Sequence, residues 1–334
     1  MPVNRRHLIG LGGAAAVSVG AAAFLVPRGA ETPGTDEAVL AFPNLAPRLA
    51  GARKVEIRQG SNTLVLDRQG ETWVLPAKGG YPARGERVRE MLAGLTELRL
   101  AERRTSDPEA LDRLGLGEPG AANSTAALLR VLDGNGAPIA ELITGRRRMR
   151  TQGGVPESIY VRRPSENQSY LAEGRVPVDA DSQLWVDRDV VNLPRERVQR
   201  VISVRDGRTI EMLRQGGSDT PLSIVLPGDA PPADDIALDE VSRAFEGLTF
   251  LDVRPEAQIP GSETGQGRFV LTDNLTVNAR VNIEGGDVWV RLAAIGDEEA
   301  SRLNARWRGW AYQVGAWKAK AFAPSLDELR ARSN

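Results

Sequence analysis

The chain of 334 residues is long enough for two domains, and its 26% charged and 41% hydrophobic residues are typical of a folded protein. Its formal charge of −1 lacks the basic excess that binding to phosphate backbones requires, which argues against nucleic acid as the main partner. It contains no cysteine, and its only histidine is His7. Beyond His7 the sequence therefore excludes disulfides, thiolate or histidine-ligated metal sites, and Ser-His-Asp triads.

The N-terminus predicts an export signal. An uncharged stretch rich in glycine and alanine covers residues 8–26, and at 1.5 Å per residue it would reach roughly 28 Å as a helix, enough to cross a hydrocarbon core. A pattern that resembles the twin-arginine signal is carried by Arg5, Arg6, Leu8 and Ile9. We therefore predict residues 1–30 as an export signal or a retained membrane anchor. The rest of the chain is expected in the cell envelope, as a periplasmic domain anchored in the inner membrane or, after cleavage, secreted to the periplasm.

Residues 31–50 are rich in proline and small residues and are predicted as a spacer. A first folded unit is predicted over 51–195. Its alternating apolar residues indicate strands at 55–57, 62–66, 72–75, 128–132, 139–143, 158–162 and 169–171. A helix over 82–100 is predicted from the spacing of Val88, Met91, Leu92 and Leu95, and 194–200 is also expected to be helical.

The same order of elements recurs over 196–325, the second predicted unit, which is followed by a tail over 326–334. Its strands are expected at 201–204, 209–213, 222–226, 268–271, 277–283, 288–292 and 311–314. A helix is predicted over 235–249, and it ends with the letters Gly-Leu-Thr, as does the main helix of the first unit. The predicted fold class is therefore α+β, with two tandem units, each an antiparallel β-meander plus one main helix and further strands.

Several short segments carry a family resemblance: Arg53 to Ile57, Trp73 to Leu75, Asp112 to Leu116, Ser158 to Val161 and Gly309 to Val314. Spread over residues 40–325, this layout resembles a bacterial domain-of-unknown-function family of membrane-tethered periplasmic proteins. Members are often encoded beside parts of ABC-type exporters and the auxiliary protein named for gliding motility. The resemblance implies a location and a transporter-associated protein partner, and it supplies no catalytic residue.

Two groups of residues are candidates for an interaction surface. The densest basic run consists of Arg146, Arg147, Arg148 and Arg150. As an exposed loop near a membrane this run would contact anionic headgroups or an acidic partner, and otherwise it is an ordinary hydrated loop. The second group is aromatic, with Trp307 and Trp310 followed by Tyr312 and Trp317. These rings bind a glycan or a partner if they are exposed, and close the core of the second unit if they are buried.

Acidic residues offer few chemical sites. Two pairs of carboxylates, each pair spaced two residues apart, are formed by Asp179, Asp181, Asp187 and Asp189. Such a pair can hold a divalent cation, act as acid and base, or simply flank and cap a short buried segment. Asp133 opens an Asp-Gly-Asn-Gly sequence, which favours a hairpin turn over a calcium loop because further ligands at alternate positions are missing.

These observations predict a non-catalytic, membrane-tethered protein that interacts with another envelope protein as an accessory component of an ABC-type export system. No catalytic, metal or cofactor site is predicted. The alternative is a periplasmic protein that binds or hydrolyses glycan or lipid-linked glycan through carboxylates such as Asp187 and Asp189, with the aromatics at Trp307–Trp317 as a platform. Convergence of these carboxylates and rings in one concave pocket would favour the alternative.

Overall fold

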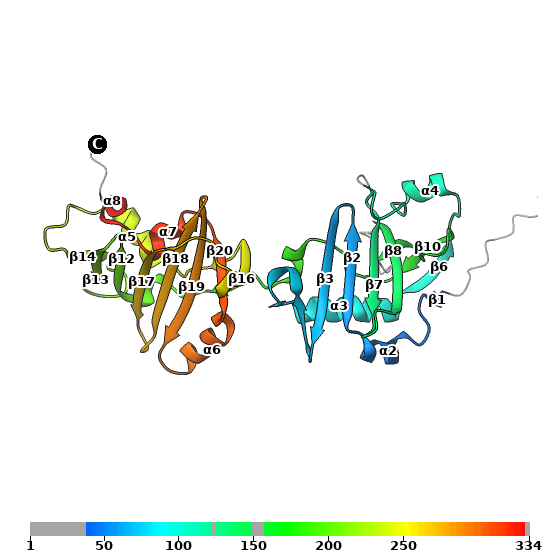
Figure 1. Cartoon of the computed structure of the whole chain (residues 1–334), viewed down its shortest axis with the longest axis horizontal. Helices are drawn as coiled ribbons and strands as arrows, with labels where there is room; N and C mark the ends of the chain where they lie inside the picture. Colours follow the sequence, from blue (N-terminus) through cyan, green and yellow to red (C-terminus); the bar gives the residue numbers. More distant parts are fainter. Residues whose placement is uncertain (1–37, 122–123, 149–156, 331–334) are drawn as a thin grey trace, which may run out of the picture.

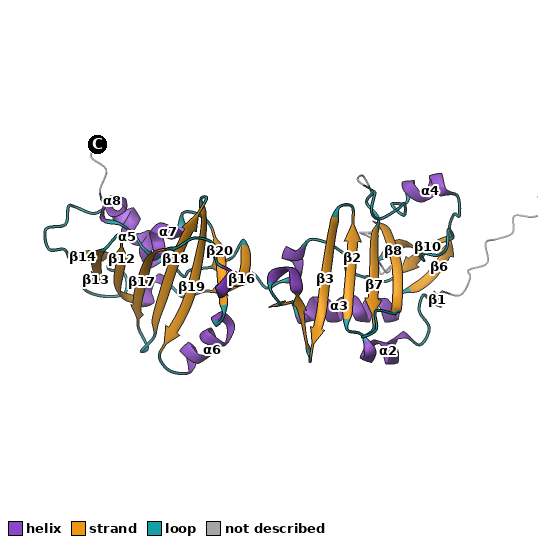
Figure 2. Cartoon of the chain, viewed as in Figure 1, coloured by secondary structure: helices purple, strands orange, loops and turns teal. Residues whose placement is uncertain are grey.

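The computed structural model describes residues 38–121, 124–148 and 157–330. Figure 1 shows two large sheets side by side along the long axis of the molecule, and Figure 2 shows the helices that accompany them. All strand pairs of both sheets are antiparallel in the described part of the chain. The protein is therefore a mixed α and β fold dominated by antiparallel strands, in agreement with the predicted class at that level.

The first sheet is built by strands β1 (Val39–Leu40), β2 (Lys54–Gln59), β3 (Asn62–Gln69), β4 (Thr72–Leu75), β5 (Tyr81–Pro82), β6 (Arg99–Arg103), β7 (Ala127–Leu132), β8 (Pro138–Arg148), β9 (Ser158–Arg162) and β10 (Ser169–Glu173). Their spatial order is β1-β6-β10-β9-β8-β7-β2-β3-β4-β5. Helix α3 (Gly85–Glu97) crosses one face of this sheet, with α2 (Leu45–Arg48) at its end, and α4 (Pro108–Arg113) follows β6.

The second sheet is built by strands β12 (Val198–Arg205), β13 (Arg208–Arg214), β14 (Leu222–Leu226), β16 (Asp252–Pro255), β17 (Glu263–Leu271), β18 (Thr276–Glu284), β19 (Asp287–Ile295) and β20 (Trp310–Val314). Their order is β14-β13-β12-β17-β18-β19-β20-β16. Four helices accompany this sheet in the described residues: α5 (Asp235–Ser242), α6 (Glu298–Trp307), α7 (Lys318–Phe322) and α8 (Leu326–Leu329).

The two sheets have the same strand order once β1 and β5 are set aside. In the first, the order reads β4-β3-β2-β7-β8-β9-β10-β6, and in the second it reads β14-β13-β12-β17-β18-β19-β20-β16. In both, a three-stranded meander precedes a helix, α3 or α5, and the chain then returns along the far edge before it fills the middle. A small additional sheet joins β11 (Asp189–Val191) to β15 (Leu248–Thr249).

Local sequence explains the main elements. Val55 and Ile57 of β2 are fully buried and alternate with polar residues, as expected of a strand with one face on the core. Helix α3 buries its apolar stripe, which includes Met91 and Leu95. Its Gly94 lets the helix lie directly against the backbone at Arg175, because a Cβ atom there would be 2.1 Å from the carbonyl oxygen of Arg175.

One continuous apolar core extends from the first sheet into the second. At the junction the ring of Tyr81 lies edge-on against Phe250, with centroids 5.6 Å apart, and against Trp310, at 4.9 Å. A salt bridge of 2.6 Å joins Lys78 to Asp252 at the rim. Aromatic contacts with a polar rim are typical of a stable interface, so the two sheets are held together by packing as well as by the covalent link.

Two predicted helices are wrong in extent. The helix expected over 235–249 ends at Ser242, because the chain turns before Gly247, which has a positive φ of 50°, and then forms β15. The side-chain oxygen of Asn192 accepts a hydrogen bond of 2.9 Å from the N–H of Gly247 and stabilises this turn. The helix expected over 194–200 is a single 3₁₀ turn, Arg195–Arg197, after which β12 begins.

The spacer predicted over 31–50 differs from the structure in its second half. From residue 38 onward this segment contains β1, which pairs with β6, and the helix α2. Ala41 and Leu45 are buried in the core of the first sheet. The folded region therefore begins before Lys54. The sequence did not indicate this, because proline and small residues surround the apolar pair.

Candidate functional site

The basic run predicted as a loop belongs to a strand. Arg146, Arg147 and Arg148 are the last residues of β8, where a register shift relative to β9 interrupts the alternation, and Arg150 lies outside the described residues. All three described side chains are exposed, but they do not form one patch. The guanidinium of Arg147 turns back and donates a hydrogen bond of 3.0 Å to the carbonyl oxygen of Val176.

Trp307 and Trp310, which were proposed for a binding platform, pack against other parts of the molecule. Trp307 is 1% exposed, and its Nε1–H donates to the carbonyl oxygen of Val190 at 3.2 Å. Trp310 is half-buried and packs against Tyr81. Trp317 is exposed, with the ammonium of Lys318 4.5 Å from its ring centroid. Trp307 and Trp310 therefore close the core and the junction, which was the alternative interpretation of this cluster.

The aspartates of the linking segment stabilise turns. Asp179 and Asp181 each accept a hydrogen bond from a backbone N–H two residues later, at 2.8 and 2.9 Å. Asp187 accepts one from the N–H of Asp189 and forms a 2.8 Å salt bridge with Arg306. These carboxylates are thus engaged by backbone N–H groups and, at Asp187, by Arg306. Within the residues described, no group of three acidic or histidine side chains is arranged to hold a metal ion.

The export signal, with Arg5, Arg6, Leu8 and Ile9, lies outside the described residues. Among the helices that the structure describes, none has both the length and the apolar character needed to span a bilayer. The signal or anchor over residues 1–30 stays a prediction.

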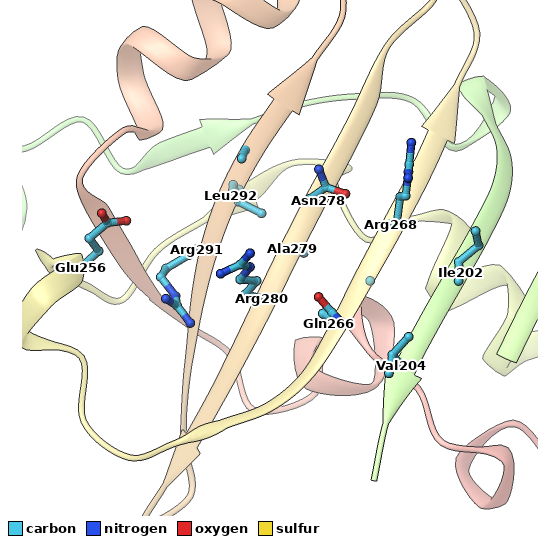
Figure 3. A pocket seen from close by; sticks show the side chains of 12 residues that line it. Ile202, Val204, Glu256, Gln266, Arg268, Asn278, Ala279, Arg280, Arg291 and Leu292 are labelled. Carbon is cyan, nitrogen blue, oxygen red and sulfur yellow. The ribbon is translucent and has the colours of Figure 1, made fainter. Parts of the chain in front are cut away.

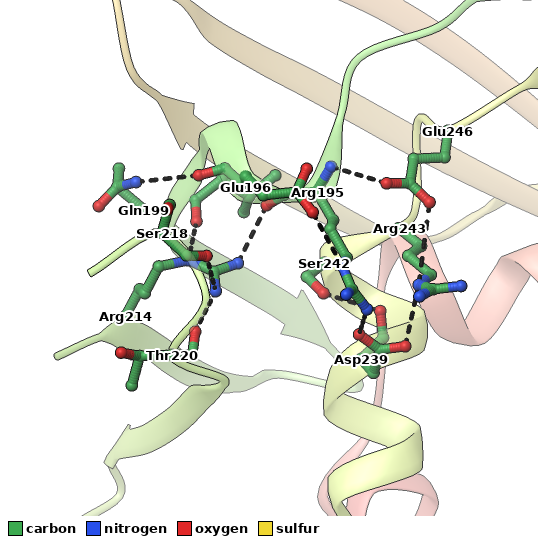
Figure 4. A network of polar contacts seen from close by, with 11 residues as sticks. Arg195, Glu196, Gln199, Arg214, Ser218, Thr220, Asp239, Ser242, Arg243 and Glu246 are labelled. Carbon is green, nitrogen blue, oxygen red and sulfur yellow. Dashed lines mark hydrogen bonds and ion pairs between the residues drawn. The ribbon is translucent and has the colours of Figure 1, made fainter. Parts of the chain in front are cut away.

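A polar network surrounds the entry to the second sheet (Figure 4). Arg195 forms a 2.7 Å salt bridge with Asp239, and its backbone N–H donates to Glu246 at 2.9 Å. The buried Arg214 donates to backbone carbonyl oxygens, that of Arg195 among them at 3.0 Å. Burial lowers the pKa of Arg214, whereas hydrogen bonds to Glu196 and Asp239 raise the pKa of Arg195. The charged groups of this network form hydrogen bonds and salt bridges with one another and with backbone carbonyl groups, and they stabilise the β13–β14 hairpin. None of the groups named here is left as a free acid or base.

The outer face of the second sheet is concave (Figure 3). It has a volume of about 580 Å³ and extends over β12, β17, β18 and β19. Its residues lie in two cross-strand rows, one of which reads Ile202, Arg268, Asn278 and Ala293, and the other Val204, Gln266, Arg280 and Arg291. We call this surface the open face. Its rows follow from the alternation within β17 and β18, which buries Gly267 and Ala279 and turns their neighbours outward.

Positive charge on the open face is only partly neutralised. Arg291 forms a 2.9 Å salt bridge with Glu263, but Arg268 and Arg280 have no salt bridge among the described residues. Arg280 is directly opposite Arg291 in the register of β18 and β19. Like charges in that position are destabilising. An anionic group bound between these side chains would relieve the repulsion.

Sequence reasoning missed the open face because its arginines are isolated in sequence. Residues 146–150 stand out as a run, whereas Arg268 and Arg280 come to lie on one face only through the pairing of β17 with β18. The signal that would have found them is the period of two in Gln266, Arg268, Asn278 and Arg280, with small or apolar residues between.

Residues 73–265 match a family described as a domain of unknown function (DUF4340). This match covers more than half of the chain. The chain belongs to this family. The expected membership of a domain-of-unknown-function family is thereby confirmed, whereas membrane tethering and the gene neighbourhood stay predictions. A search of curated proteins finds no match.

The DUF4340 match begins in β4 and ends at Gly265 in β17, so it includes parts of both sheets. Arg268, Arg280 and Arg291 of the open face lie just beyond it. The family description supplies no activity, and a function has to be argued from the surface.

Proposed function

We propose that this protein is a non-catalytic, membrane-tethered extracytoplasmic component that acts through protein–protein interaction, as an accessory part of an ABC-type export system. The open face carries this proposal. A concave, solvent-exposed sheet surface with two arginines that form no salt bridge to any residue the structure describes fits an acidic segment of a partner protein, because guanidinium groups bind carboxylates in a planar, bidentate manner. The twin-arginine pattern at Arg5 and Arg6 supports the envelope location.

We further propose that the chain consists of two tandem units, 51–195 and 196–325. The equal strand order of the two sheets and the equal position of α3 and α5 support this view. A duplicated scaffold suits an interaction protein, because one unit can keep a structural role while the other presents a surface. The shared core at Tyr81 and Phe250 would hold the units in one orientation.

The glycan-binding or glycan-hydrolysing alternative has less support. It needs two carboxylates that flank a substrate, with aromatic rings beside them. Asp187 is engaged by Arg306, and Trp307 is buried. We therefore give no role in catalysis to these residues.

The test is affinity purification of the full chain from gently solubilised membranes. The variant Arg268→Glu with Arg280→Glu reverses the charge of the open face. A matched control, Arg89→Glu with Arg208→Glu, makes the same charge change at two exposed arginines that lie elsewhere. We expect ABC-type export components with the unmodified chain and the control, and their loss with the open-face variant.

Two results would contradict the proposal at different points. Equal recovery of export components with all three proteins would exclude the open face as the docking surface. If the unmodified chain yields no export component, the accessory role itself is wrong.

A further inference from the structure

A second concavity, on the inner side of the first sheet, has a different chemical character. It lies between the first turns of α3 and the ends of β7, β8 and β9, and it has a volume of about 230 Å³. Three arginines from distant parts of the chain line it: Arg87, Arg147 and Arg175. Further polar side chains come from Gln59, Thr125, Thr144 and Asp179. We call it the arginine pocket.

The three arginines are held in different ways. Arg147 is positioned by its hydrogen bond to the carbonyl oxygen of Val176, and its nearest carboxylate, that of Glu157, is 3.8 Å away. Arg175 forms a 3.2 Å salt bridge with Glu90 at the exposed rim and lies 4.0 Å from the same Glu157 carboxylate. Neither Glu90 nor Glu157 lines the pocket, and these pairs are partly exposed, so each of them is weak.

Arg87 is the arginine without an anionic partner. Its guanidinium lies over the ring of Trp185, 5.1 Å from the centroid, which orients the planar group. Its Nε atom is buried and has no hydrogen-bond partner, and no salt bridge joins Arg87 to any described residue. The single carboxylate that lines the pocket, Asp179, already accepts the backbone N–H of Asp181. A buried donor without a partner is costly, and a bound anion would satisfy it.

We propose that the arginine pocket binds a phosphoryl group. Three guanidinium groups against one lining carboxylate fit a ligand with about two negative charges, and a phosphate monoester has a charge of about −1.5 to −2 near neutral pH with three acceptor oxygens. The pocket is smaller than the roughly 300–1,000 Å³ typical of sites for drug-sized ligands, which suits a single anionic group and not a whole cofactor. This inference is independent of the open face, because it concerns the other sheet.

The same chemistry has two sources, a free phosphate or phosphomonoester and a phosphorylated lipid headgroup. Isothermal titration of the detergent-solubilised full chain with inorganic phosphate, at constant ionic strength, tests the shared chemistry. Titration with glycerol phosphate and with vesicles that contain phosphatidic acid separates the two sources. Binding of both soluble compounds but not of the vesicles would assign the site to a free ligand, and preference for the vesicles would assign it to lipid.

The deciding variant is Arg87→Gln, with Arg89→Gln as its control on the same helix. Arg89 is exposed and does not line the pocket. We expect Arg87→Gln to weaken phosphate binding by about tenfold or more, as loss of a charge-assisted hydrogen bond does, and Arg89→Gln to leave it unchanged. Should Arg87→Gln unfold, Arg87→Lys keeps the charge without the planar fork and should still weaken binding.

Three results would overturn the inference. These are the absence of saturable phosphate binding, equal weakening by the two glutamine variants, or equally tight binding of succinate, which would indicate a dicarboxylate ligand.

Discussion

The two large sheets share a strand order but differ in what lies on their outer faces. In the first sheet, the connection from β6 to β7 includes α4, and its described residues, 104–121 and 124–126, pack over β7, β8 and β9. In the second sheet the corresponding connection, residues 256–262, is a short 3₁₀ turn and a loop. The first outer face is therefore partly covered, and the second is the open face (Figure 1).

The side chains on the two faces correspond to this difference. Beneath the cover, Leu111 and Leu116 form a small apolar cluster with Ile143 of the sheet. The sheet's Arg162, 5% exposed, anchors the cover by donating to the carbonyl oxygen of Leu116 at 2.7 Å. The open face has no such cluster among the described residues, and its outward positions are mostly polar.

The outer faces of the two sheets also differ in how completely their arginines are paired with carboxylates. On the first sheet, Arg130 lies between two carboxylates, at 2.7 Å from Glu141 and 3.8 Å from Glu56. On the second, Arg268 and Arg280 lack such partners among the described residues. The scaffold alone therefore does not decide what lies on the outer face. The length of one connection decides whether that face is covered or exposed to solvent.

The largest effect tests whether the two sheets are independent folding units. Leu95 of α3 and Leu248 of β15 are each 1% exposed. Truncation of either to alanine should lower the free energy of unfolding by about 2–5 kcal/mol, because a buried leucine leaves a cavity. Chemical denaturation of both single variants and of the double variant measures these losses.

The informative comparison is between the loss of the double variant and the sum of the losses of the two single variants. If the sheets keep separate cores, the losses should add to within about 0.5 kcal/mol. A clear departure from additivity would mean that the junction at Tyr81 and Phe250 couples the cores. The two sheets would then unfold as one cooperative body.

A smaller effect tests the cover. Arg162→Met removes the hydrogen bonds to the carbonyl oxygens of Leu116 and Gly117, and the loss should be about 1–3 kcal/mol because buried acceptors remain unpaired. Hydrogen exchange should accelerate in residues 107–117 and stay unchanged in β18. The exposed Arg280, replaced by methionine as a control, should change stability by less than about 0.5 kcal/mol. Unchanged exchange in 107–117 would show that apolar packing alone retains the cover.

Much of the strand pattern was accessible from the sequence. The alternation of buried and exposed residues predicted the positions of β2, β3 and β12 to within a few residues, because each has one face on the core. The helices were harder. Helix α6 was missed, since only Ala300 and Trp307 of its residues are fully buried and most of the others are polar. The helix predicted over 235–249 was too long, because the apolar spacing continues through a turn into β15.

The candidate sites were less accessible, and for a physical reason. Sites on sheets are assembled by pairing register, which single-sequence patterns do not contain. The arginine pocket combines residue 87 of a helix, 147 of a strand and 175 of a loop, and nothing in the sequence relates them. The run at 146–150 includes Arg147, which lines the arginine pocket, but its neighbours do not line it. The tryptophans were recognised as a group, and the burial of Trp307 and the packing of Trp310 favour the core interpretation for these two.

The last effect concerns a pH dependence that belongs to the second sheet alone. Lys318 of α7 is 5% exposed, and its ammonium donates to the carbonyl oxygens of Ala244 at 2.7 Å and Arg243 at 3.2 Å. Burial lowers its pKa from 10.5 to about 8, against a smaller opposing influence of Glu246. Between these values the unfolded chain binds more protons than the folded one, so the contribution of Lys318 to stability should increase as pH rises.

Denaturant titrations of the unmodified protein and of Lys318→Met, from about pH 7.5 to 9.5, should therefore differ in slope, with the positive slope reduced in the variant. Higher pH is unsuitable, because burial also raises the pKa of Tyr81 and Tyr312, and their unfolded forms ionise near pH 10, which lowers stability. Parallel pH profiles would mean that water reaches the ammonium. The packing of α7 against α5 would then be looser than that of α3 on the first sheet, and the two cores would differ in quality as well as in their outer faces.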